Sequence, residues 1–141
     1  MFFSGSPFSI DTDDGSDRVN CTNNVIVSQP LFKTDFAGHQ KTFQGNVDLY
    51  GSCGGSAAFG DDTNVFSGNK CVGIGAPAKC VPCATPGKDC AIIQDNEYFT
   101  APNGTAPTTV CPAGNTEAGS TVNALPADGG IGLAKTALGM Q

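Results

Sequence analysis

The chain has 141 residues, of which 19 are glycine, 9 are proline and 14% are charged, so it is of single-domain size and favours many short strands over long helices. Seven basic against thirteen acidic residues give a formal net charge of −6. This balance excludes a protein that coats nucleic acid, because phosphate binding needs clustered Lys and Arg.

Seven cysteines indicate an oxidising location, extracellular or at the cell surface, with disulfides, and their odd number leaves at least one thiol unpaired. Sequons at Asn20 and Asn103 agree with a glycoprotein of that compartment. No signal peptide is visible and no segment is long and apolar enough to span a membrane. We therefore expect a fragment of a longer chain whose upstream part is missing.

An acidic run follows the apolar N-terminal residues. Residues 11–17 read Asp-Thr-Asp-Asp-Gly-Ser-Asp. One interpretation is a calcium site formed by Asp11, Asp13 and Asp14, since Ca²⁺ prefers oxygen ligands, although the Glu that completes an EF-hand loop is absent. The other interpretation is a solvated turn, because Asp and Gly are common turn formers.

Four later segments, 19–27, 41–49, 64–72 and 91–99, align on a central asparagine. The aligned residues are Asn24, Asn46, Asn69 and Asn96, which are 22, 23 and 27 positions apart. An apolar residue or cysteine stands three positions before each of them and an apolar residue three positions after. The pattern predicts two short strands that meet at a bend, with turn formers just before each Asn and with stacked Asn amides that bond to one another as a ladder.

The repeat predicts an all-β fold, a right-handed parallel β-helix (solenoid) of about four coils of roughly 22 residues with a C-terminal cap. Residues 1–110 are expected to form the coils, with a disulfide-rich loop at 73–90. Residues 111–141 are expected to form the capping segment, with a short helix over 131–140 that begins after Asp128. The alternative is a β-sandwich in which Asn turns recur by chance.

The same offset predicts which charged residues lie side by side. A shift of 22 positions places Asp35 over Asp13, Lys33 over Asp11 and His39 over Asp17, and a shift of 23 carries His39 onto Asp62. Neighbouring parallel strands lie about 4.8 Å apart, so these side chains form the most polar patch of the chain. The candidate catalytic residues are His39, Asp13, Asp35, Lys33, Asp17 and Lys41.

Two chemistries suit this patch. In the first, His39 acts as a base that removes a proton next to a carboxylate, while Lys33 or Lys41 stabilises the resulting anion and Asp13 or Asp35 orients them. In the second, Asp13 and Asp35 act as the carboxylate pair of a glycoside hydrolase. A purely structural histidine is the competing interpretation of His39. Cys80 and Cys83 have zinc-knuckle spacing, but disulfides explain them more simply.

The chain also resembles a known family. The resemblance is to the C-terminal coils of secreted right-handed β-helix proteins of the pectate-lyase-like superfamily, and the segments that carry it are 7–16, 22–25, 33–39, 45–46, 68–71, 125–128 and 131–134. It implies an extracellular protein that binds or modifies a polysaccharide, with acidic polymers among the candidates, as a lyase, epimerase or glycoside hydrolase.

Two alternatives to this function remain open. The first is a non-catalytic surface or cell-wall protein, an adhesin or structural element, because a fold alone does not decide function. The second takes the cysteines around 80–83 and 111–114 as cysteine-rich surface-antigen repeats, which leaves the asparagine repeat unexplained.

Overall fold

The computed structural model describes residues 10–12, 16–27, 33–34, 40–50, 65–73, 92–100 and 117–140. Within these residues each of the four aligned segments forms two strands of three or four residues separated by a bend, and residues 117–124 form a fifth such pair. The strands before the bends are β2 (Asn20–Thr22), β5 (Thr42–Gln44), β7 (Val65–Ser67), β9 (Ile92–Gln94) and β11 (Glu117–Ala118). The strands after the bends are β3 (Val25–Val27), β6 (Val47–Leu49), β8 (Lys70–Gly73), β10 (Glu97–Thr100) and β12 (Thr121–Ala124).

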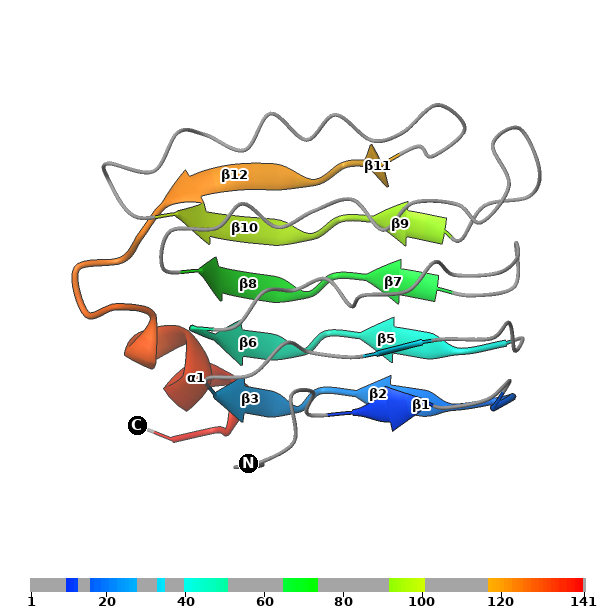
Figure 1. The fold of residues 1–141 in the computed structure, drawn as a ribbon. Helices are drawn as coiled ribbons and strands as arrows, with labels where there is room; N and C mark the ends of the chain where they lie inside the picture. Colours follow the sequence, from blue (N-terminus) through cyan, green and yellow to red (C-terminus); the bar gives the residue numbers. More distant parts are fainter. Residues whose placement is uncertain are drawn as a thin grey trace.

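Successive copies stack in parallel and build two sheets that share the line of bends (Figure 1). One sheet has the order β11-β9-β7-β5-β2 and the other has the order β12-β10-β8-β6-β3. Cys21 pairs with Phe43, and Val25 pairs with Val47, which confirms the offset of 22 predicted from the sequence. A separate pair, β1 (Asp11–Thr12) and β4 (Lys33–Thr34), has the same offset and sets Asp11 beside Lys33.

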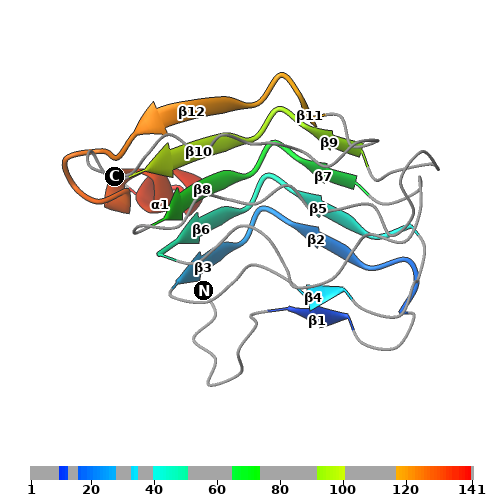
Figure 2. The ribbon, with the colours of Figure 1, turned by 45° about the horizontal axis from the view of Figure 1, so that its top comes forward.

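The predicted closed β-helix with a C-terminal cap is wrong. The described residues form two five-stranded parallel sheets, one two-stranded pair and one helix, and no closed coil is found among them. Figure 2 shows the two sheets meeting at an angle along the bends, with β1 and β4 apart from them. The physical reason is that the asparagine repeat determines only the bend and the stacking of the two strands beside it. It does not determine whether the segments between the copies complete a coil of a β-helix.

The bends depend on left-handed backbone conformations. The residue before each ladder position has a positive φ, which is 56° at Asn23, 65° at Gly45, 61° at Gly68, 56° at Asp95 and 71° at Gly119. Glycine adopts this conformation without a steric cost, and Asn and Asp tolerate it better than other residues. The turn formers expected before each ladder position are therefore confirmed, and the strand directions change at the same point in every copy.

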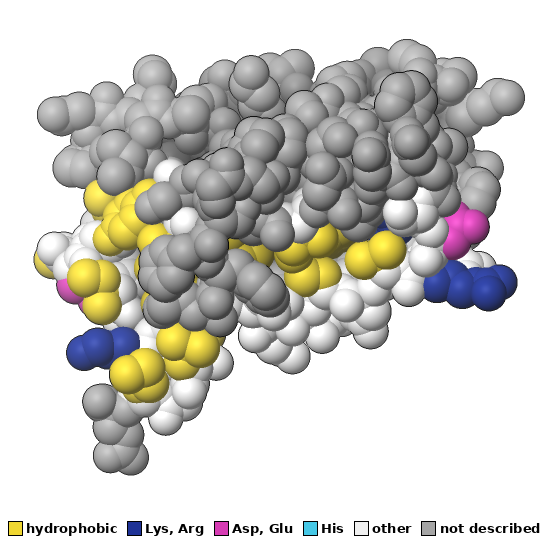
Figure 3. All heavy atoms as spheres, turned by 60° about the horizontal axis from the view of Figure 1, so that its bottom comes forward, with side chains coloured by type: hydrophobic (Ala, Val, Ile, Leu, Met, Phe, Trp, Pro, Cys, Tyr) yellow, Lys and Arg dark blue, Asp and Glu magenta, His cyan; other side chains and the backbone are white. Residues whose placement is uncertain are grey.

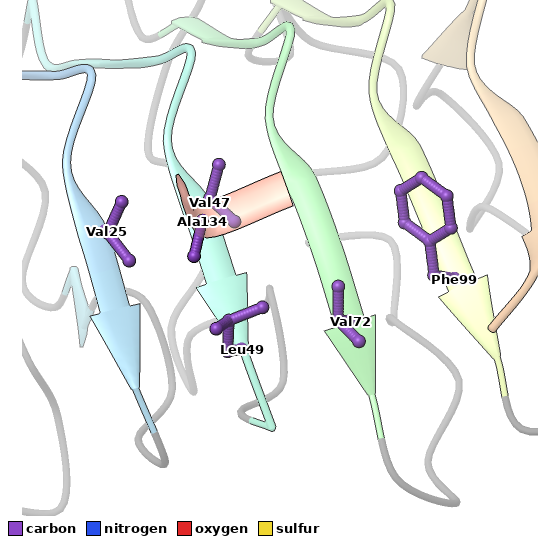
Figure 4. Close-up of a cluster of buried hydrophobic side chains, with 6 residues drawn as sticks. All are labelled: Val25, Val47, Leu49, Val72, Phe99 and Ala134. Carbon is purple, nitrogen blue, oxygen red and sulfur yellow. The ribbon is translucent and has the colours of Figure 1, made fainter. Parts of the chain in front are cut away.

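The helix α1 (Ile131–Ala137) packs against the sheet that contains β6. Ala134 is 7% exposed and lies in one hydrophobic cluster with side chains from four strands, as Figure 4 shows: Val25, Val47, Leu49, Val72 and Phe99. Gly130 directly precedes the helix and lies very close to the sheet: a Cβ at this position would be 3.0 Å from Cγ2 of Val72. Small residues thus let the helix backbone approach the strands.

A helix was expected over 131–140, and its start at Ile131 is confirmed, but its place is not the expected one. Instead of covering the last copy of the stack, the chain turns back after Ala124, and α1 contacts β6, which neighbours the edge strand β3. The sequence showed that the segment is apolar and rich in small residues. It did not show which surface that apolar side covers.

Candidate functional site

The four repeated asparagines form a ladder of side-chain hydrogen bonds at the bends. Nδ2 of Asn24 donates to Oδ1 of Asn46 over 3.1 Å, Asn46 donates in the same way to Asn69 over 3.0 Å, and Asn69 donates to Asn96 over 3.1 Å. The last three of these side chains are fully buried. Buried polar groups need partners, and each amide here has donors and acceptors satisfied by neighbouring copies. The predicted ladder is confirmed.

Each ladder amide also bonds to backbone. The backbone N–H of Asn46 donates to Oδ1 of Asn69 over 3.0 Å, and Nδ2 of Asn46 donates to the carbonyl of Cys21 over 3.0 Å. The same two contacts recur around Asn69. One amide therefore connects three consecutive copies, and the ladder fixes the register of both sheets at the bend.

Sequence reasoning missed a fifth copy of the repeat. Ser120 takes the ladder position between β11 and β12, and its Oγ accepts the backbone N–H of Asn96 over 3.0 Å. Gly119, the preceding turn former, was the available signal, because Gly45 and Gly68 stand at the same place in their copies. This copy was missed because it has a serine where the others have asparagine, and because residues 111–141 were interpreted as a capping segment.

A groove of about 360 Å³ lies between this line of bends and α1. We call it the α1–turn groove. Its residues come from the bends, from the strands after them and from the helix: Asn23, Gly45 and Gly68; Val47 and Lys70; Leu133, Thr136 and Ala137. The volume falls in the range of small-ligand sites, and apolar side chains alternate with a few polar groups, as such sites require.

Among the described residues that line the α1–turn groove, Lys70 is the one with a charged side chain. Its Nζ lies 2.7 Å from Oε1 of Glu97, which stands directly opposite on β10, and both side chains are a little over one third exposed, at 37% and 39%. The ammonium group has three donors, so one is used by Glu97 and the others remain available to bond acceptors in the groove.

The backbone of the helix start is held by an acidic side chain. Oδ1 of Asp128 accepts the N–H of Gly130 over 2.9 Å, and Oδ2 accepts the N–H of Gly132 over 2.7 Å. These two backbone bonds, first that of Gly130 and then that of Gly132, lower the pKa of Asp128. Asp128 was expected to cap the helix, but the N-cap residue is Gly130; Asp128 lies two positions earlier and accepts N–H groups at the helix start, so the groove wall formed by α1 still depends on it.

Cys21 is a free and buried thiol. Burial raises the pKa of this thiol, and the hydrogen bond from Nδ2 of Asn24, 3.1 Å from Sγ, partly offsets that rise. A neutral thiol is a poor nucleophile. Cys21 therefore serves as a core residue below the first bend rather than as a reactive group.

The residues predicted to be catalytic are divided between described and undescribed parts of the chain. His39, Asp13, Asp35 and Asp62 lie outside the described residues, as do Asp14 of the predicted calcium site and most of the 73–90 loop. Asp11 and Lys33 lie side by side in β1 and β4, as the offset predicted. Asp17 is exposed.

Lys41 is fully buried. It lies two positions before Phe43, which is also fully buried, and alternation in a strand sends both side chains to the same face. An ammonium group in this position does not meet a ligand at the surface. The alternation was visible in the sequence, but the charge of Lys41 suggested exposure instead.

The described residues contain no group of three His, Cys, Asp or Glu side chains placed to hold a metal ion. In the same part of the chain, no helix has both the length and the apolar character needed to cross a membrane. Neither a protein-family model, nor a curated protein, nor a solved structure matches this chain. The resemblance to pectate-lyase-like proteins therefore stays a prediction from the sequence.

Proposed function

We propose that this chain is an extracellular polysaccharide-binding protein and that the α1–turn groove holds the glycan. The observation that carries the proposal is the composition of the groove. Val47, Leu133 and Ala137 offer aliphatic surface for the C–H faces of a sugar, and Asn23, Lys70 and Thr136 offer groups that bond hydroxyls.

The direction of the α1–turn groove supports a polymer as its ligand. The bend residues Asn23, Gly45 and Gly68 follow one another on adjacent copies, about 4.8 Å apart along the stack. This spacing is comparable to the length of one sugar residue in an extended glycan. Gly68 leaves room for a chain to lie close to the backbone, because a Cβ there would meet only a backbone nitrogen 4.0 Å away.

The test is a binding assay against a panel of soluble polysaccharides with a variant that fills the groove. Ala137→Trp places a large side chain in the groove from an exposed helix position, and Ile131→Trp is the matched control, because Ile131 is 50% exposed on the same helix and does not line the groove. We expect Ala137→Trp to weaken glycan binding at least about tenfold, which corresponds to the loss of roughly 1.4 kcal/mol. Ile131→Trp should bind like the wild type. Absence of any glycan binding by the wild type would overturn the proposal.

Whether the chain also modifies the glycan is a separate prediction. A lyase, epimerase or hydrolase activity depends on His39, Asp13 and Asp35, which the described residues do not include. Incubation with alginate and pectin, followed by ultraviolet absorbance of unsaturated product, tests the lyase form. Product that disappears in a His39→Ala variant would support it, and binding without product would favour a lectin-like role.

The second candidate, a non-catalytic surface or cell-wall scaffold, is favoured by the asparagine ladder. The buried amides of Asn46 and Asn69 each join three copies, which gives a rigid stack suited to display or structure. Resistance to proteolysis without any glycan binding would support this candidate over the first.

A further inference from the structure

The charge of the α1–turn groove indicates which kind of glycan it accepts. Its charged lining residue, Lys70, already pairs with Glu97 over 2.7 Å, so the positive charge facing the groove is balanced by a carboxylate. A carboxylate on a ligand would have to compete with Glu97 for the ammonium group. The gain from such an exchange is small, because one ion pair is lost as another forms.

The surroundings of this pair add negative charge. Asp95 is exposed at the bend of the same copy as Glu97, two residues earlier in the chain. Of the other described cations, Lys41 is fully buried and adds no positive charge at the surface, whereas Arg18 and Lys135 are exposed; Lys135 lies on α1 but is not among the residues that line the groove. On the face drawn in Figure 3, the dark blue side chains lie mainly at opposite ends, with hydrophobic and uncharged side chains between them. The exposed cations among the described residues of this face are separated from one another, and a chain of net charge −6 would repel a polyanion.

A neutral hydroxyl suits the Lys70–Glu97 pair better than a carboxylate does. The ammonium group donates to the oxygen of a hydroxyl, and the carboxylate accepts the hydrogen of the same or the adjacent hydroxyl. Both groups keep their mutual contact while they bind. The pair then binds two sugar hydroxyls of matching spacing, and the ammonium and carboxylate groups stay in contact.

We infer that the α1–turn groove selects uncharged, hydroxyl-rich polysaccharides over polyuronates, with Lys70 and Glu97 as the residues that determine this selectivity. The inference rests on the proposed function and sharpens it, because the resemblance in the sequence left an acidic polymer open. It also predicts that binding depends little on salt, since no net charge is neutralised on association.

The experiment compares neutral glucan and mannan oligosaccharides with oligogalacturonate and alginate oligosaccharides by calorimetry. For the wild type we expect a neutral ligand to bind at least about tenfold more tightly than either uronate, which is roughly 1.4 kcal/mol. We also expect its Kd to change less than about twofold between low and high salt, because screening acts on net charge.

The variant Glu97→Gln frees Lys70 from its partner. It should weaken binding of the neutral ligand several-fold and raise the affinity for uronates, with a salt dependence that the wild type lacks. Arg18→Gln is the control, since it removes an exposed charge at a residue that does not line the groove and should leave the preference unchanged. Circular dichroism of each variant verifies folding.

The outcomes separate the two proposals. Tighter binding of a uronate than of every neutral ligand by the wild type, weakened by salt, would overturn the selectivity and leave the groove as a glycan site. Equal affinity for both classes would also overturn the selectivity. No binding of either class would overturn the proposed function together with the inference drawn from it.

Discussion

The amide of Asn46 connects three copies of the repeat through bonds that water does not replace, because its side chain is fully buried. Asn46→Ala leaves the N–H and amide of Asn24 and the carbonyl of Cys21 without these partners. Each buried polar group that loses its partner costs roughly 1–3 kcal/mol, so we expect the free energy of unfolding to fall by about 3 kcal/mol. Urea denaturation followed by circular dichroism measures this change.

Gln44 provides the control for that substitution. It lies two residues away on β5, is exposed, and makes no ladder bond among those found at the bend. Gln44→Ala should change the free energy of unfolding by less than about 0.5 kcal/mol. A similar loss in both variants would show that the ladder adds nothing beyond the strand itself.

Two bend glycines differ in what surrounds them, and this difference gives a second test. Both have a positive φ, yet a Cβ on Gly45 would lie 2.5 Å from Oδ1 of Asn23, whereas a Cβ on Gly68 meets only a backbone nitrogen 4.0 Å away. Gly68→Ala should cost about 1–2 kcal/mol, the usual price of the left-handed conformation for a residue with a Cβ. Gly45→Ala should cost clearly more.

The double variant Asn23→Ala/Gly45→Ala removes the obstructing oxygen and should recover the excess loss of Gly45→Ala. Denaturation midpoints of the three variants and the wild type complete the cycle. Equal costs for Gly45→Ala and Gly68→Ala would contradict the close approach of Asn23 to the next bend.

At the scale of elements, the attachment of α1 depends on Asp128. The hydrogen bonds from Gly130 and Gly132 hold the pKa of Asp128 below its usual value of about 3.9. A group with a lowered folded-state pKa stabilises the fold above its unfolded pKa, and this contribution is lost as the pH falls through the folded pKa. The start of the helix should therefore loosen in acid, below about pH 4.

The variant Asp128→Asn tests this pH dependence. The wild type should be more stable than Asp128→Asn at pH 6, and the gap between their urea midpoints should close as the pH falls below about 4, where the carboxyl becomes neutral like the amide. A gap that stays constant across this range would show that the charge of Asp128 does not hold the helix.

The elements were predictable from the sequence to different degrees. The strand pairs and their offset followed from the aligned asparagines and from apolar residues such as Phe43 and Leu49. The start of α1 followed from Asp128 and Ile131. Its position on β6 did not follow, because no sequence pattern links the small residues Gly130 and Ala134 to that strand, whereas in the structure their small size permits close packing.

The candidate site was less predictable than the fold. The offset correctly set Asp11 beside Lys33, but the charged patch around His39 lies outside the described residues. The α1–turn groove was not foreseen, since it combines Asn23 and Lys70 with residues of α1 more than sixty positions later. A local sequence pattern does not indicate a contact between residues so far apart in the chain. The groove depends on where α1 packs on the sheet.

For the whole molecule, the number of free thiols tests the predicted oxidising location. Cys21 is free and buried, and burial raises the pKa of its thiol, so it should react very slowly with a thiol reagent in the folded protein. If the other six cysteines pair, the unfolded and unreduced chain should release one reactive thiol, and a Cys21→Ala variant should release none. Seven reactive thiols without reductant would contradict the extracellular assignment.

The hydrogen-bond ladder also gives the stack a direction. The amides of Asn24, Asn46 and Asn69 each donate to the Oδ1 of the next copy, and at Ser120 a hydroxyl with one donor replaces the amide with its two donors and separate acceptor. A repeat duplicated between Asn24 and Asn96 would meet the same donors and acceptors on both sides. A repeat added after Ser120 would not. Gene duplication between Asn24 and Asn96 can therefore lengthen this protein without changing the contacts of the ladder.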